Sequence, residues 1–202
     1  MSRGLKKKYE TILARERTLA NSIARAVVRP KPIGVWDIMI PMIFILNYLK
    51  GKHAKELFIQ NYIFTKKLAL QAALDMLQGG KSREEVMNAV RDKTEVVLKG
   101  GGGGVYSEQI RSKQMKEIAV LMDHYHTLLD TDGKDYDTLV VSAYGDRRTY
   151  TEFVKSLETC EKAVLEAARQ TLGDQTDSAA LIRLEEATAR VRGAEINRIF
   201  GS

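Results

Sequence analysis

Hydrophobic residues recur at every third or fourth position along most of the chain, the spacing that places side chains on one side of an α-helix. Residues 139–141 are the one short stretch that would also suit a strand. Prolines, which interrupt helices, occur at only three of the 202 positions. The pattern therefore predicts an all-α protein, a helical bundle of about six to seven helices.

The most hydrophobic part of the chain lies in residues 33–77. Residues 33–49 form an apolar run, and after a polar turn the segment 54–77 carries apolar side chains around nearly its whole circumference. A helix that is apolar on every side has to be buried among other helices. Pro41 starts or kinks a helix inside the first run. We therefore expect a central hydrophobic helical hairpin.

Membrane contact is the alternative for residues 33–49. The run is 17 residues long and contains Asp37 and Asn47, whereas a transmembrane helix needs about 20 apolar residues. It is therefore a poor candidate for crossing a bilayer. The sequence is compatible both with burial of this run in the core and with its contact with a membrane surface.

Capping residues predict where several other helices begin. Ser82 followed by Glu85 has the spacing of a capping box, and so does Thr149 followed by Glu152. Ser107 precedes another apolar pattern and is suited to cap it. Including the helix that ends before Pro30, the remaining helices are expected at about 5–29, 82–97, 107–129, 138–144, 149–172 and from 178 onward.

Five consecutive glycines, residues 100–104, interrupt the helical pattern. A glycine run packs no side chains and suits a flexible connector. It separates a basic N-terminal half, 1–99, which contains the hydrophobic hairpin, from a C-terminal half, 105–202. Because the first half devotes so much apolar surface to two helices, we expect the helices of the second half to cover it and both halves to pack as one domain.

The positive charge of the protein is concentrated near the N-terminus. Residues 1–55 contain twelve Lys or Arg and three Asp or Glu, a net charge of +9, while the other 147 residues contain 20 basic and 23 acidic side chains, a net charge of −3. Basic flanks around an apolar, tryptophan-bearing segment are typical of contact with an anionic membrane surface. The predicted contact residues for such a surface, or for another anionic partner, are Arg25, Arg29, Lys31, Trp36, Phe44, Lys50, Lys52 and Lys55.

This charge pattern favours a non-enzymatic helical scaffold or adaptor at an anionic membrane surface, with a protein partner as another possibility. A nucleic-acid binder is a less favoured alternative, because no helix-turn-helix or RNA-binding signature accompanies the basic region. No catalytic motif is found, and no cofactor is expected. The single cysteine, Cys160, permits no intramolecular disulfide and fits a reducing, cytoplasmic location.

A second alternative is a metal-binding bundle. Asp123, His126 and Asp130 are spaced three and four residues apart, so they share one side of a helix as metal ligands must. A carboxylate-bridged metal site needs further inward carboxylates and usually a second histidine motif. Outside residues 123–126 the chain has one other histidine, His53. Packing at the edge of a hydrophobic face explains these residues more simply.

Overall fold

The computed structural model describes residues 3–27, 54–100, 106–172 and 178–201. Over this part of the chain it contains seven helices and no strand, which confirms the prediction of an all-α bundle. Residues 139–141, the candidate strand, are helical. The helices are α1 (Arg3–Val27), α2 (Ala54–Gly79), α3 (Arg83–Gly100), α4 (Glu108–Asp130), α5 (Tyr136–Tyr144), α6 (Arg147–Leu172) and α7 (Ser178–Phe200).

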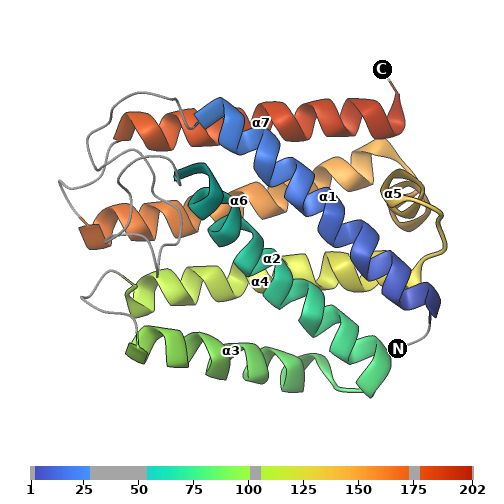
Figure 1. Cartoon of the computed structure of the whole chain (residues 1–202), viewed down its shortest axis with the longest axis horizontal. Helices are drawn as coiled ribbons and strands as arrows, with labels where there is room; N and C mark the ends of the chain where they lie inside the picture. The colour runs from blue at the N-terminus through green and yellow to red at the C-terminus, as the bar shows by residue number, and fades with distance from the viewer. Residues whose placement is uncertain (1–2, 28–53, 101–105, 173–177, 202) are drawn as a thin grey trace.

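Four of the helices, α3, α4, α6 and α7, run roughly side by side, and α1 and α2 cross this row obliquely (Figure 1). The short helix α5 lies at the end of the bundle where α4 ends and α6 begins. Helix α2 packs against α1, α3 and α4, and α1 also packs against α7. The helix predicted to be central from its apolar circumference is therefore central, whereas 33–49, the other arm of the predicted hairpin, lies outside the described residues.

The hydrophobic core combines helices that precede and follow the glycine run. In the larger core cluster, Ile12 of α1 and Leu70 of α2 pack with Leu121 and Tyr125 of α4. A second cluster brings α1 and α2 together with Leu184 and other residues of α7. Burial of these side chains is the main source of stability in such a bundle. The helices before the glycine run and the helices after it therefore bury each other's apolar side chains.

Two predicted caps are confirmed. The backbone N–H of Glu85 donates to the Ser82 hydroxyl, and the backbone N–H of Ser82 donates to the Glu85 carboxylate, which completes the capping box of α3. The Ser107 hydroxyl accepts a hydrogen bond from the backbone N–H of Ile110 at the start of α4. These bonds satisfy N–H groups that the first turn of a helix leaves without partners.

The predicted capping box of α6 is wrong. Helix α6 begins at Arg147, before Thr149, because the Asp146 carboxylate accepts the backbone N–H of Thr149 at 2.8 Å and so caps the helix earlier. The preceding helix, α5, ends at Gly145 as expected from the sequence. Gly145 has φ of 75°, a conformation that side chains other than glycine rarely adopt. Gly145 thus ends α5, and the next residue, Asp146, caps α6.

Candidate functional site

Helix α1 presents a basic side to solvent. Five cations are exposed along it, and at about 3.6 residues per turn their positions fall on one side of the helix. Glu10 is the exposed acid on this helix, and it lies 4.0 Å from Lys6. The opposite side contributes Ile12, Ala20 and Ile23 to the core. We call the exposed cations, Arg3, Lys6, Lys7, Arg17 and Arg25, the basic side of α1.

Only two of the predicted membrane-contact residues fall in the described part of the chain. Arg25 is exposed on the basic side of α1, and Lys55 is half-buried in the first turn of α2. No helix within the described residues is long and apolar enough to cross a membrane. The other predicted contact residues, Arg29, Lys31, Trp36, Phe44, Lys50 and Lys52, lie outside the described residues.

The three candidate metal ligands are all on α4, near its C-terminal end. Asp123 is exposed and forms two hydrogen bonds of 3.0 Å with the Arg83 guanidinium. His126 is half-buried and Asp130 is exposed. Within the described residues, no group of three or more His, Cys, Asp or Glu side chains is placed to hold a metal ion. The geometry therefore gives the metal hypothesis no support.

A buried ion cluster lies where α2, α4, α6 and α7 meet. The Lys66 ammonium, on α2, donates to the Glu117 carboxylate of α4 at 3.1 Å and to the Glu161 carboxylate of α6 at 2.9 Å. Arg192, on α7, binds both oxygens of Glu161 at 2.7 Å. The side chain of Lys66 is 3% exposed and that of Arg192 is 6% exposed. These four residues, the ion cluster, link four helices inside the bundle.

Attraction between opposite charges keeps Lys66 and Glu161 ionised inside the bundle. Burial alone would lower the pKa of Lys66, but Glu161 and Glu117 outweigh that effect and leave the pKa raised. Burial alone would raise the pKa of Glu161, yet Arg192 and Lys66 bring it down to about 2. Burial dominates for Glu117, whose pKa is raised. The Glu161 carboxylate, the Lys66 ammonium and the Arg192 guanidinium are therefore the groups of the cluster that stay charged at neutral pH.

Further polar groups are buried beside the ion cluster. Glu195 of α7 accepts hydrogen bonds from Arg15 and from the Tyr150 hydroxyl, each at 2.9 Å. Glu16 of α1 accepts from the Tyr125 hydroxyl at 2.8 Å, while its second oxygen has no partner among the described residues. Burial raises the pKa of Glu16. Buried charges of this kind are weak sources of net stability, because desolvation opposes the attraction between them.

A pocket opens to solvent next to the ion cluster. Its empty volume, including space open to solvent, is about 770 Å³. Lys66, Glu117 and Glu161 form part of its lining, and apolar side chains of α6 and α7 form another part. Both kinds of surface are typical of sites for small molecules, which combine apolar walls with a few polar groups. The apolar and aromatic lining residues are Tyr62, Val164, Leu165, Leu184 and Ala189.

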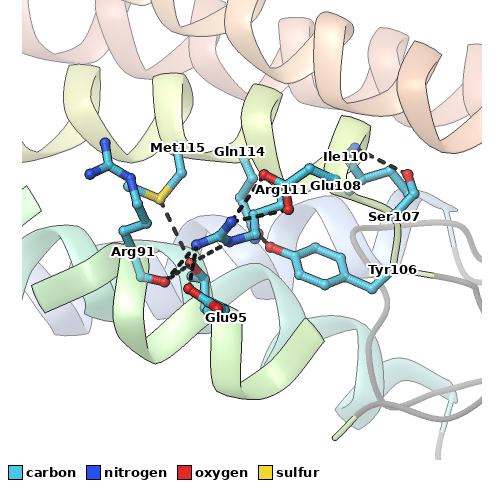
Figure 2. Close-up of polar contacts among 10 residues, drawn as sticks. Arg91, Glu95, Tyr106, Ser107, Glu108, Ile110, Arg111, Gln114 and Met115 are labelled. Carbon is cyan, nitrogen blue, oxygen red and sulfur yellow. Dashed lines mark hydrogen bonds and ion pairs between the residues drawn. The ribbon is translucent and has the colours of Figure 1, made fainter. Parts of the chain in front are cut away.

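A separate polar network fastens α3 to α4 (Figure 2). The Arg111 guanidinium, on α4, donates to the backbone carbonyl of Arg91 at 2.9 Å and to the Thr94 hydroxyl at 3.2 Å, both on α3. It also pairs with Glu108 at 3.0 Å and lies 3.8 Å from Glu95. Each donor is used within the protein, so Arg111 holds two helices together rather than facing a ligand.

The ion cluster and the pocket were not predicted from the sequence. A partial signal was present for Lys66, since it lies within the apolar circumference of residues 54–77, but Lys67 next to it is exposed, so the sequence does not distinguish the two lysines. Glu117, Glu161 and Arg192 carry no comparable signal, because each lies on a helix with many other charged residues.

Comparison with protein-family models, with curated proteins and with solved structures finds no match to this chain. The class that the fold defines is a seven-helix all-α bundle over the described residues, with a buried ion cluster and an open pocket.

Proposed function

We propose that the protein is a non-enzymatic helical scaffold or adaptor that associates with an anionic membrane surface through its basic N-terminal region. The observation that carries this proposal is the basic side of α1, where five cations are exposed along a single helix face. This face belongs to residues 1–55, which hold a net charge of +9. In this proposal the basic side of α1 faces the membrane, and the C-terminal helices pack on the opposite side of α1. The binding is reversible.

The size of the effect can be estimated from the charge. A Lys or Arg near an anionic leaflet contributes about 1 kcal/mol, and the attraction falls off within a Debye length of about 10 Å at 0.1 M salt. Three such cations together would supply about 3 kcal/mol, or about a hundredfold in affinity. Binding should therefore weaken strongly when salt is added.

The test uses the full chain and sedimentation with lipid vesicles. We expect binding to vesicles that contain an anionic phospholipid, release by salt, and little binding to neutral phosphatidylcholine vesicles. The triple variant Lys7→Gln, Arg17→Gln and Arg25→Gln should bind anionic vesicles about a hundredfold more weakly. These side chains are exposed, so the fold should tolerate the changes.

The matched control neutralises three exposed lysines on other helices, Lys93→Gln, Lys116→Gln and Lys155→Gln. It removes the same net charge and should keep most of the binding. Equal losses in the two triple variants would show that overall charge, not the basic side of α1, governs the interaction. Failure to bind anionic vesicles, with tight binding to a duplex DNA fragment, would overturn the membrane proposal in favour of nucleic acid.

A further inference from the structure

The ionisable groups buried between α1 and the ion cluster do not balance in charge. Three are cations and four are carboxyl groups, and none has more than 21% of its side chain exposed. If all of them were ionised, one negative charge would remain in an interior largely shielded from water, which is costly. One retained proton removes this excess. The groups are the cations of Arg15, Lys66 and Arg192 and the carboxyls of Glu16, Glu117, Glu161 and Glu195.

Glu16 is the carboxyl of this group that contacts no cation among the described residues. Its Oε1 accepts a hydrogen bond from the neutral Tyr125 hydroxyl at 2.8 Å, and its Oε2 has no partner within the same residues. Each of the other three carboxyls contacts a cation: Glu117 contacts Lys66 at 3.1 Å, Glu161 contacts Arg192 at 2.7 Å, and Glu195 contacts Arg15 at 2.9 Å. An ionised carboxylate without a cation is far more costly to bury than a neutral acid. The retained proton therefore belongs on Glu16.

Glu117 competes with Glu16 for this proton, because burial raises the pKa of both carboxyls. The Lys66 ammonium favours ionisation of Glu117 by direct contact, whereas it acts on Glu16 from beyond ion-pair distance and burial outweighs its effect on the pKa. Protonation of both carboxyls would leave one positive charge in excess. A single proton on Glu16 is therefore the state in which each buried charge of the group has a partner of opposite sign.

The groups around Glu16 supply no further cation within the described part of the chain. Helix α1 packs against α2, α4, α5 and α7. The titratable and charged side chains that face Glu16 are Tyr62 and Lys66 of α2, His124 and Tyr125 of α4, Tyr136 of α5, Tyr150 of α6, and Arg192 and Glu195 of α7. The tyrosines and the histidine are neutral at pH 7, because burial raises the pKa of the four hydroxyls and lowers that of the imidazole to about 3. Lys66 and Arg192 already contact carboxylates of the ion cluster, so an ionised Glu16 would have no counter-ion of its own.

We propose that Glu16 keeps its proton in the folded protein at neutral pH and acts as a pH-sensitive switch that controls how tightly α1 packs against the bundle. As a neutral acid it leaves the other buried charges paired. Loss of the proton at higher pH places an unpaired carboxylate between α1 and the helices that it contacts, and weakens their packing. Because α1 also carries the basic side, the switch sets the pH range over which that surface is held on the bundle. The proposal does not rest on membrane association.

Carbon-13 NMR of the full chain locates the proton without any substitution. The side-chain carboxyl carbon of a glutamate changes its chemical shift when the group gains or loses a proton, and correlation to the rest of the side chain assigns each signal. We expect the Glu16 signal at pH 7 to have the position of a protonated acid and to move to that of a carboxylate only at higher pH. The pKa of Glu161 is about 2, so its signal serves as the internal reference for an ionised group.

The variant Glu16→Gln tests whether the proton is linked to folding. The unfolded chain releases it near the ordinary pKa of about 4.5, so the stability due to Glu16 is present below that pH and is lost as the pH rises until the folded group itself ionises. Between pH 5.5 and 6.5, the unfolding equilibrium constant of the unmodified protein should rise about tenfold relative to that of Glu16→Gln in chemical denaturation. The ratio of the amide hydrogen exchange rates of the two proteins at Ile12 and Ile23, both in α1, should rise by the same factor.

The matched control is Glu10→Gln, which changes an exposed glutamate on the same helix and should keep the pH dependence of the unmodified protein. An ionised Glu16 at pH 7, with or without a protonated Glu117, would overturn the proposal. A folded Glu16→Gln variant with the pH dependence of the unmodified protein would do the same. If Glu16→Gln does not fold, the NMR titration of the unmodified protein decides. None of these measurements uses vesicles, so failure here and failure of the membrane proposal can be told apart.

Discussion

Buried charged and polar side chains are the residues that set this bundle apart. Lys66 and Glu117 are almost completely buried, each on a different helix, and they are 3.1 Å apart. Removing one partner from such a pair leaves the other charge buried without compensation, which is far more costly than never having buried the pair. We therefore expect the ion cluster to favour the arrangement of α2, α4, α6 and α7 in which all of its charges are paired.

His124 shows a different kind of burial, that of a neutral imidazole. Its Nδ1 lies 2.6 Å from the Tyr144 hydroxyl, and its ring stacks on Phe153 with centroids 4.1 Å apart. Burial lowers the pKa of His124 to about 3. Below pH 6.5 the His124 imidazole is protonated in the unfolded chain but stays neutral in the native state. The contribution of His124 to the free energy of unfolding is therefore lost as the pH falls from about 6.5 towards 3.

The prediction for His124 concerns the difference in stability between pH 7 and pH 5. This residue should account for a loss of about 2 kcal/mol over that range, so His124→Phe should lose that much less than the unmodified protein in chemical denaturation. Burial raises the pKa of Glu16 and of Glu117, which gives the opposite pH trend, but both carboxyls are common to the two proteins and cancel in the comparison.

A suitable control for this experiment is Val140→Ala, which destabilises the core without removing a titratable group. It should keep the pH dependence of the unmodified protein. An unchanged loss between pH 7 and pH 5 in His124→Phe would contradict the assignment of a neutral, buried imidazole.

At the scale of helices, α2 is enclosed by α1, α3 and α4. Its small residues Ala69, Ala72 and Ala73 are buried and let neighbouring helices approach closely. Leu70 is 1% exposed, whereas Leu68, two positions earlier, is only partly buried against the core. The two leucines therefore provide a matched test of how much of α2 is enclosed.

Leu70→Ala is expected to lower the free energy of unfolding by about 2–5 kcal/mol, because it leaves a cavity in the closed core. Leu68→Ala should cost clearly less, since partly exposed surroundings can relax around the smaller side chain. Thermal or chemical denaturation of both variants gives the comparison. A Leu70→Ala variant as stable as the unmodified protein would show that α2 is not central.

At the scale of the whole molecule, the question is whether the helices on either side of the glycine run form one folding unit. Helix α2 packs against α4, and Ile12, Leu70 and Tyr125 belong to the same core cluster. The ion cluster joins α2 with α4, α6 and α7 as well. Surfaces of this kind would be exposed if the two parts separated.

We therefore expect the two parts to stay together after the chain is cut. A protease site placed in the run at residues 100–104 should yield fragments that elute as one species in gel filtration. Insertion of five further glycines is the control, since loop closure costs only about 0.6 kcal/mol for each doubling of length. Two independently folded, monomeric fragments, identified by gel filtration and circular dichroism, would refute the single-unit model.

Local sequence patterns were enough to predict the helical class, the central position of residues 54–77 and two of the caps. The reason is that these features depend on short-range spacing: apolar residues every three or four positions, or a Ser three residues before a Glu. The failure at Thr149 has the same origin, because Asp146 offered an equally local cap three residues earlier. The count of charged residues also needs only the sequence. It identifies residues 1–55 as strongly basic, and the basic side of α1 lies within that region.

Tertiary structure alone decided which charged residues are buried and which face solvent. Lys66, Glu117, Glu161 and Arg192 are up to 126 residues apart in the chain, and only the packing of four helices brings them into contact. The unpaired hydroxyl of Tyr62 and the pocket beside it arise from the same packing. Periodicity places a side chain on one side of its own helix, but the neighbours on that side are chosen by how the helices cross.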